Sequence, residues 1–203
     1  MSDPYARETA SFIVSRDRAF KHLIDEVGPI RGPRASRLDA RFAELVQSIS
    51  HQLLATKAAR TIHARVYELC DGEVNVDVVR ALGPERLKSV GLSRTKAEAM
   101  VELAEHVADG RIDLARHGYM DDEAVTTQVT AVRGIGPWTA QMYLMFTLAR
   151  KDVWPVGDYG VRHGWSVVHN LDEIVSEKAL REVGARFVGV RSTVAHYCWR
   201  AVD

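Results

Sequence analysis

A glycine-rich turn at the start of a helix is the first pattern in this chain that could do chemistry. Gly134 and Gly136 flank a single residue, and Pro137 follows directly. Glycine can adopt backbone angles that are closed to other residues, and proline fits the first turn of a helix, where its missing N–H costs nothing. Such a turn points several backbone N–H groups toward one place, backed by the positive end of the helix. We therefore expect an anion-binding site here.

The carboxylate of Asp158 is the second feature with chemical potential. It follows Pro155 and precedes a predicted helix that starts near Tyr159, so the helix dipole favours its ionised form. An ionised carboxylate can stabilise positive charge that develops in a reaction, and it can orient or activate a water. Asp158 can equally be an ordinary helix N-cap, which accepts a hydrogen bond from the first turn.

The segment that joins these two features is predicted to be a buried helix. Its apolar residues fall on two faces at helical spacing: Trp138, Met142, Met145 and Ala149 on one, and Ala140, Leu144 and Leu148 on the other. A helix that is apolar on both sides belongs in the interior of a protein.

Apolar residues recur at helical spacing through most of the remaining chain. Four stripes of this kind are Phe42, Leu45, Val46, Ile49 and Leu53; Ala58, Ile62, Val66 and Leu69; Ala97, Met100, Val101, Ala104 and Val107; and Ile174, Leu180, Val183 and Phe187. Ser192 fits the N-cap of a last helix, residues 27–33 read as a loop, and Gly91 marks a turn between two helices. No run of alternating strands is visible, so the predicted class is all-α.

The composition limits the possible functions but does not identify one. The 203 residues suit one sizeable domain or two small helical lobes, and no apolar run reaches membrane-spanning length. The 27 basic and 27 acidic residues balance, which counts mildly against a nucleic-acid partner, although backbone amides and local charge can still hold a phosphate. Cys70 and Cys198 lie outside any metal-ligand pattern and are expected to be reduced core thiols.

Taken together, these pieces resemble the helix-hairpin-helix DNA glycosylase superfamily. The turn at residues 134–140, the apolar helix to residue 148 and the Pro-Val-x-Asp pattern that ends at Asp158 resemble its 3-methyladenine (alkyladenine) DNA glycosylase II branch. Residues 49–53 and 57–59 resemble the part of that family that faces the lesion, and residues 191–192 with 197–200 resemble its C-terminal helix. The resemblance covers about residues 10–203 and is most specific from the hairpin to Asp158.

The resemblance implies both a fold and an activity. The fold would be all-α, with two helical lobes, a helix-hairpin-helix motif and an active-site cleft between the lobes. It would form a single domain over residues 1–203, with the hairpin and catalytic segment at about 126–165. The activity would be that of a monofunctional DNA glycosylase of base excision repair, which flips an alkylated purine such as 3-methyladenine out of the duplex and hydrolyses its N-glycosidic bond. The partner would be double-stranded DNA containing alkylated bases.

The same resemblance implies a monomeric protein of the cytoplasm, nucleoid-associated in a bacterium. No membrane contact, cofactor or metal is expected, and none of the eight histidines falls in a zinc-binding spacing. An alkylated base already carries positive charge and leaves as a neutral species, so a single carboxylate can suffice for the reaction.

The resemblance also assigns roles to individual residues. Asp158 would stabilise the oxocarbenium-like sugar. Trp138 stands where strand-nicking relatives carry a Schiff-base lysine, which makes this chain monofunctional. The expected base pocket consists of Trp138, Met142 and Tyr159. The expected DNA-binding residues are Gly134, Gly136, Thr139, Gln52 and Leu53, with Gln52 and Leu53 at the minor groove and Leu53 as the wedge. Leu53 also fits the helical stripe given above, so a place in the core stays open for it.

Two departures from the family pattern affect pocket shape and lesion preference. His51 stands where glutamine is common, and Gly189-Val190 stands where proline and an aromatic residue are commoner. The four-cysteine iron–sulfur loop of the endonuclease-like branch is absent from the sequence.

Three alternative functions remain open at this point. If residues 126–132 formed a strand, Gly134-x-Gly136 followed by Asp158 would fit a dinucleotide-binding oxidoreductase, although Thr139 occupies the third glycine position. A non-catalytic DNA-binding module could use the same hairpin, but it has no use for a carboxylate that repels the DNA backbone. A glycosylase for neutral bases such as hypoxanthine would benefit from an additional general acid.

Overall fold

The computed structural model describes residues 4–52 and 56–203, so Leu53, the predicted wedge, lies outside the described residues. Every regular element in the described part of the chain is a helix or helical turn. The chain divides into two compact units: a terminal unit, Met1–Arg34 with Ala149–Asp203, and a central unit, Ala35–Leu148. The predicted all-α class and its two helical lobes are confirmed. Within residues 4–52 and 56–203, no helix has the length and apolar character needed to cross a membrane.

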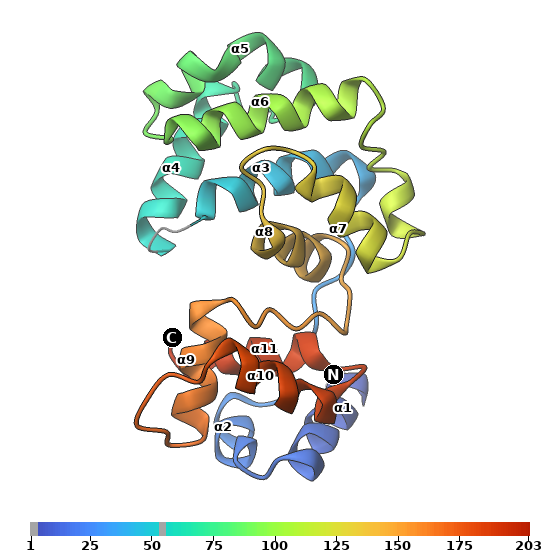
Figure 1. Ribbon diagram of the computed structural model, residues 1–203, viewed down its shortest axis with the longest axis vertical. Helices are drawn as coiled ribbons and strands as arrows, with labels where there is room; N and C mark the ends of the chain where they lie inside the picture. Colours follow the sequence, from blue (N-terminus) through green and yellow to red (C-terminus); the bar gives the residue numbers. More distant parts are fainter. Residues whose placement is uncertain (1–3, 53–55) are drawn as a thin grey trace. The chain divides into compact units, whose positions relative to one another are not determined.

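The terminal unit joins the two ends of the chain. Its helices are α1 (Pro4–Arg16), α2 (Phe20–Val27), α9 (Tyr159–Val168), α10 (Glu177–Val183) and α11 (Arg191–Arg200), with the 3₁₀ turn η4 (Gly184–Phe187) after α10. In Figure 1 the blue N-terminal helices lie among the orange and red C-terminal ones. Phe20 meets Trp165 and Phe187 edge-to-face, with ring centroids 5.6 and 6.1 Å away. This aromatic core ties α2 to α9 and η4.

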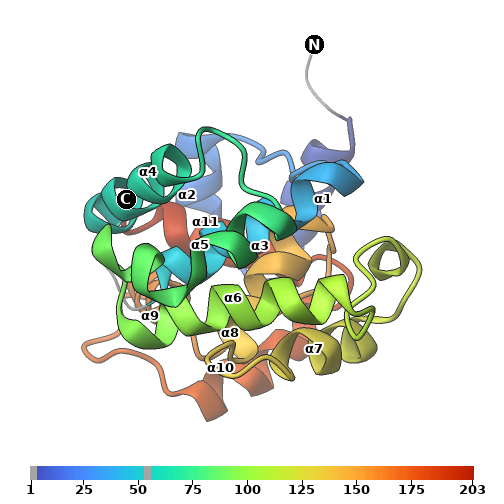
Figure 2. The ribbon, with the colours of Figure 1, turned by 90° about the horizontal axis from the view of Figure 1, so that it is seen from above.

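The central unit holds the rest of the helices. They are α3 (Arg41–His51), α4 (Thr56–Leu69), α5 (Val76–Ser89), α6 (Arg94–Ala108), α7 (Asp122–Thr130) and α8 (Pro137–Met142), with the short turns η1 (Leu38–Ala40), η2 (Arg116–Gly118) and η3 (Tyr143–Thr147). Helices α5 and α6 lie side by side in both views (Figure 1, Figure 2). The core of this unit includes Leu45, Ile49, Leu87, Met100 and Tyr143, all fully buried.

Two of the predicted stripes define their helices well. In α3 the stripe residues Phe42, Leu45, Val46 and Ile49 are buried, and the helix ends at His51. In α6 the buried face includes Ala97, Met100 and Ala104, and Ser93 caps the helix by accepting a hydrogen bond from the Lys96 N–H. The turn at Gly91 joins α5 to α6, as the sequence predicts.

Two other stripes are wrong at their first residue. In α4 Val66 is buried and Ile62 and Leu69 are half-buried, but Ala58 is exposed and the neighbouring Ala59 is buried in its place. Helix α10 does not extend back to Ile174. It begins after Ser176, whose hydroxyl accepts a hydrogen bond from the Ala179 N–H and so fixes the start of the helix.

Candidate active site

Asp158 is held by two hydrogen bonds at the start of α9. Its Oδ1 accepts a hydrogen bond from the Val161 N–H at 2.8 Å and another from the Trp199 indole N–H at 2.9 Å. The side chain is 9% exposed. The predicted helix start near Tyr159 is confirmed, and Asp158 is its N-cap. The N-cap bond accounts for one of these two donors, and the second comes from a helix 41 residues further along the chain. The carboxylate is therefore fixed by tertiary structure as well as by its own helix.

Small residues on α9 make room for the indole that reaches Asp158. A Cβ at Gly160 would lie 2.8 Å from Trp199 Cδ1 and 3.0 Å from its Nε1. One turn later, a Cβ at Gly164 would lie 1.8 Å from the Cys198 carbonyl oxygen, so the backbones of α9 and α11 touch there. The role of Trp199 was missed from the sequence, although the spacing of Gly160 and Gly164 on α9 is a signal for such a close helix contact.

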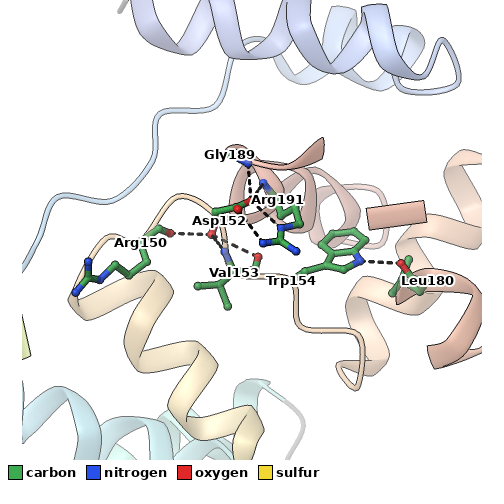
Figure 3. A network of polar contacts seen from close by, with 8 residues as sticks. Arg150, Asp152, Val153, Trp154, Leu180, Gly189 and Arg191 are labelled. Carbon is green, nitrogen blue, oxygen red and sulfur yellow. Dashed lines mark hydrogen bonds and ion pairs between the residues drawn. The ribbon is translucent and has the colours of Figure 1, made fainter. Parts of the chain in front are cut away.

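The segment that leads to Asp158 is tied to the start of α11 (Figure 3). The Asp152 carboxylate accepts hydrogen bonds from Arg191 Nε and Nη2, both at 2.7 Å, and from the Gly189 N–H at 2.7 Å. Burial alone would raise the pKa of Asp152, but these hydrogen bonds outweigh it and hold that pKa below its ordinary value. A two-pronged guanidinium–carboxylate contact fixes direction as well as distance, so residues 150–154 have a defined path.

Ser192 has a different role from the one predicted. It lies in the first turn of α11, whose preceding residue is Val190, and it is not the N-cap. Its hydroxyl donates to the Arg150 carbonyl at 2.7 Å and accepts a hydrogen bond from the Val153 N–H at 3.0 Å. These partners are about 40 residues away in the sequence, so Ser192 secures the same segment that Asp152 and Arg191 hold.

The glycine turn lies between α7 and α8 and has the predicted form at one of its two glycines. Gly134 has a φ of +89°, and a Cβ there would lie 3.2 Å from Ala99 Cβ and 3.3 Å from Thr95 Cγ2. Gly136 has a φ of −97° and a ψ of 176°, an extended conformation open to any residue, so the expectation of special backbone angles at Gly136 was wrong. A Cβ at Gly136 would meet no atom within 4 Å. The fold requires glycine at position 134. At position 136 the lack of a side chain leaves the backbone uncovered.

The helix after the turn is buried, as predicted. Ala140, Met142, Leu144, Met145 and Leu148 are all 8% exposed or less. The helix begins with Pro137 and passes into a π-helical turn, η3, whose last hydrogen bond runs from the Leu148 N–H to the Tyr143 carbonyl. It ends before Ala149, which has a φ of +55°. The π turn was not predicted from the sequence.

Gln52 and Thr139 are bonded to each other inside the central unit. The Gln52 side-chain amide donates to Thr139 Oγ1 at 2.8 Å and to the Gly134 carbonyl at 3.1 Å. Thr139 is 1% exposed. These bonds join the end of α3 to the turn and to the first turn of α8. The DNA contacts predicted for Gln52 and Thr139 stay predictions, while the structure shows their side chains bracing the hairpin.

The predicted base-pocket residues belong to two different units. Trp138 is half-buried and Met142 is 6% exposed, and both belong to α8 of the central unit. Tyr159 is 64% exposed at the start of α9 in the terminal unit. Each residue adjoins a predicted functional element: Trp138 and Met142 adjoin the glycine turn, and Tyr159 adjoins Asp158. The pocket itself stays a prediction.

Positive charge lies next to the glycine turn. Arg133 and Arg94 are each 77% exposed at the side chain, and both pair with the single carboxylate of Glu98, at 3.6 and 2.8 Å. The hydrogen bond from Arg94 lowers the pKa of Glu98, so this carboxylate is ionised at neutral pH. The Arg133 N–H also donates to the Glu102 carboxylate at 3.2 Å, and the charge of Glu85 acts on Arg94, so nearby carboxylates offset the two guanidinium charges.

The dinucleotide-binding alternative is excluded by the local structure. Residues 126–130, which that fold requires as part of a strand, lie in helix α7, which begins after the N-cap Asp121. In the part of the chain that the structure describes, no three His, Cys, Asp or Glu side chains gather where a metal ion could bind. Cys70 and Cys198 are both free and buried, as expected.

Comparison with known proteins identifies the family to which this chain is related. A family model described as HhH-GPD superfamily base excision DNA repair protein matches residues 46–188. The DNA-3-methyladenine glycosylase 1 of Schizosaccharomyces pombe is 27% identical over 187 residues, which cover 91% of this chain and 82% of the yeast protein. The DNA-3-methyladenine glycosylase of Saccharomyces cerevisiae is 29% identical over 177 residues, which cover 82% of this chain and 59% of that protein.

Two solved structures show the same architecture. The Schizosaccharomyces pombe 3-methyladenine DNA glycosylase in complex with abasic DNA matches with a TM-score of 0.89 at 26% identity, over 95% of each chain. A DNA-3-methyladenine glycosidase from Bacillus halodurans matches with a TM-score of 0.80 at 30% identity, over 100% of this chain and 90% of that one. This chain belongs to the HhH-GPD superfamily of base excision DNA repair proteins. The family resemblance inferred from the sequence is confirmed.

Proposed function

We propose that this chain is a monofunctional DNA glycosylase of base excision repair that hydrolyses the N-glycosidic bond of alkylated purines such as 3-methyladenine. Its partner is double-stranded DNA that contains alkylated bases, and its place of action is the cytoplasm, at the chromosome. Relatives named for 3-methyladenine across most of the chain support this substrate class. The observation that carries the proposal is the carboxylate of Asp158, fixed by Val161 and Trp199 within a chain that also holds the glycine turn.

The glycine turn supplies the contact with the DNA strand. Its backbone N–H groups at the start of α8 suit a phosphate, and the bare surface at Gly136 lets a sugar–phosphate strand approach the main chain closely. The exposed guanidinium of Arg133, in the same turn, offers a further contact for a phosphate. The target nucleotide leaves the base stack because its glycosidic bond is inaccessible inside a duplex.

Asp158 carries the chemistry. As the bond between C1′ and the base nitrogen breaks, its electron pair stays on the nitrogen and neutralises the positive charge of the alkylated base. The Asp158 carboxylate stabilises the positive charge that develops on the sugar. A water oxygen then bonds to C1′, and a proton of that water passes to the carboxylate. The products are a free base and an abasic sugar.

The DNA strand stays intact because the glycine turn carries no lysine amine that could attack the sugar. Trp138 follows Pro137 in the hairpin, and an indole cannot form a Schiff base with the sugar. The abasic site is therefore the end product of this protein.

Incubation of the protein with alkylated genomic DNA tests the proposal. Chromatography of the supernatant should show released methylated purines, and strands should break only after later treatment with alkali. A duplex with a single hypoxanthine serves as the comparison substrate. Binding without release of any base would make the protein a non-catalytic DNA-binding module. Release of hypoxanthine in preference to methylated purines would move the substrate class to neutral bases, and nicking without alkali would exclude the monofunctional mechanism.

A further inference from the structure

Lys96 has an unusual position for a lysine. It lies in the first turn of α6, where the helix dipole disfavours a cation. Its ammonium is partly buried and donates to the Gln52 carbonyl at 2.7 Å and to the Ser50 carbonyl at 3.0 Å. Those carbonyls belong to the end of α3, where a helix leaves its last acceptors unpaired and where the dipole favours a cation. Burial lowers the pKa of the Lys96 ammonium. The lysine thus stabilises the end of one helix from the start of another.

The backbone that Lys96 holds is also the backbone that carries Gln52. The Gln52 side-chain amide donates to the Gly134 carbonyl and to Thr139 Oγ1. Residue 95, next to Lys96, packs on the same turn: a Cβ at Gly134 would lie 3.3 Å from Thr95 Cγ2 and 3.5 Å from the Thr95 carbonyl. A short chain of contacts therefore leads from the Lys96 ammonium through Gln52 to the glycine turn. All of these residues lie in the central unit.

The geometry points to Lys96 as a positioning residue for DNA binding: it sets the end of α3 so that Gln52 holds the glycine turn in the shape that binds the strand. This inference rests on the proposed function, because it takes the turn as the DNA-binding element. Lys96 acts through the Ser50 and Gln52 carbonyls and makes no phosphate contact of its own. A lysine in a DNA-binding protein is ordinarily a phosphate ligand, so the two roles make different predictions.

Salt dependence separates the two roles. A lysine that contacts a phosphate releases one counterion on binding, so its removal lowers the slope of log K against log salt by about 0.9. A lysine that only shapes the turn leaves the number of phosphate contacts unchanged. Its removal weakens binding at every salt concentration and leaves the slope as it was.

The test compares wild type with Lys96→Met, in which a side chain of similar length has neither charge nor donors. Lys88→Met is the matched control, because Lys88 is an exposed lysine of α5 that pairs with Glu85. Binding to a duplex with an abasic-site analogue is followed by fluorescence anisotropy at several salt concentrations. We expect Kd to rise about tenfold for Lys96→Met, the equivalent of one lost charge-assisted hydrogen bond, with the salt slope unchanged. Lys88→Met should bind as wild type does.

A double-mutant cycle checks that Lys96 acts through Gln52. Gln52→Ala removes the brace directly, so Gln52→Ala with Lys96→Met should bind no more weakly than Gln52→Ala alone. Lys96→Arg keeps a cation and donors and should restore most of the affinity. Base release from saturated complexes should stay within about twofold of wild type in Lys96→Met, since the carboxylate of Asp158 is untouched. If Lys96→Met does not fold, Lys96→Gln takes its place.

Three outcomes would overturn the inference. One is a salt slope lowered by about one unit, which would make Lys96 a phosphate ligand. Another is an unchanged Kd for folded Lys96→Met, which would limit Lys96 to stability. The third is additive losses in the cycle with Gln52. None of these results depends on which base is released, whereas a wild type that releases no base would contradict the proposed function itself.

Discussion

Trp199 controls the direction in which the Asp158 carboxylate points. The indole N–H and the Val161 N–H both donate to Oδ1, so the carboxylate has one fixed orientation at the start of α9. Catalysis by a charged group depends on such preorganisation, because a group that must reorient during the reaction stabilises the transition state less. Under the proposed function, Trp199 would therefore act as a positioning residue for the reaction.

Replacement of Trp199 by phenylalanine tests this role. Trp199→Phe keeps an aromatic ring but loses the donor, and we expect the single-turnover rate of base release to fall about tenfold or more. Trp165→Phe is the control, because Trp165 packs in the aromatic core against Phe20. That variant should lose stability but keep its rate within about twofold. Equal losses of rate in the two variants would mean that Trp199 merely fills space.

We expect DNA binding to depend on the glycine turn, whose two glycines differ in conformation and surroundings. Gly134 has a positive φ and close neighbours, so Gly134→Ala should lower the free energy of unfolding by about 1–2 kcal/mol. Gly136 is extended and open, so Gly136→Ala should change stability by less than about 0.5 kcal/mol. The methyl group of Gly136→Ala should instead weaken DNA binding roughly fivefold, because it stands where the strand approaches.

Urea unfolding and anisotropy measure the two effects separately. Folded Gly134→Ala protein should bind DNA more weakly as well, because the turn is distorted. A Gly136→Ala variant that is destabilised but binds DNA as wild type does would contradict the different roles assigned to the two glycines.

The segment before α9 also contributes to the site. Its contact with α11, through Asp152 and Arg191, depends on pH. The pKa of Asp152 is lower in the folded protein than in the unfolded chain, so at low pH the unfolded chain binds the proton more readily. The stability that Asp152 contributes is complete above about pH 4 and is lost as the pH falls further toward its folded pKa. We expect the free energy of unfolding to fall more steeply below about pH 4 in wild type than in Asp152→Asn. Parallel curves from urea titrations would contradict this.

At the scale of the whole molecule, buried histidines set the pH dependence of stability near neutrality. His117 is 0% exposed and lies between the Tyr143 hydroxyl and the Gln128 side-chain oxygen, each at 3.0 Å. Burial lowers its pKa, an effect that the Gln128 hydrogen bond opposes and the charge of Arg41 reinforces. Burial also lowers the pKa of His63 and that of His196.

A histidine with a lowered pKa stays neutral in the folded protein while the unfolded chain takes up the proton. The stability it contributes is complete above its unfolded pKa of about 6.5 and is lost as the pH falls below it. Urea unfolding should therefore give a lower free energy of unfolding at pH 5.5 than at pH 7.5. His117→Gln, which keeps a donor and an acceptor, should show a smaller difference, and an equal difference would exclude His117 as a contributor.

Local patterns in the sequence predict the parts of this molecule that depend on neighbours in the chain. The stripes of α3 and α6, the turn at Gly91, the buried helix after Pro137 and the N-cap position of Asp158 are all confirmed. Each is fixed by residues within three or four positions, where helical periodicity and capping rules apply.

Features that depend on distant parts of the chain were missed or placed wrongly. Ser192 looks like an N-cap in the sequence, but its hydroxyl is bound to Arg150 and Val153. The Trp199–Asp158 bond and the Gln52–Gly134 bond likewise span 41 and 82 residues. Sequence periodicity carries no information about such pairs. The small residues at Gly160 and Gly164 are the one local sign of the close contact between α9 and α11.

The central claim is that the carboxylate of Asp158 drives base release, and its most direct test is the rate of that step in Asp158→Asn. Enzyme in excess over a duplex with one methylated purine is sampled over time, and the free base is measured by chromatography. We expect a rate at least about a thousandfold below wild type, the scale typical of the loss of a key transition-state charge. Binding to abasic-site DNA should remain within about threefold, because the glycine turn is unchanged. Base release by folded Asp158→Asn at the wild-type rate would contradict the account.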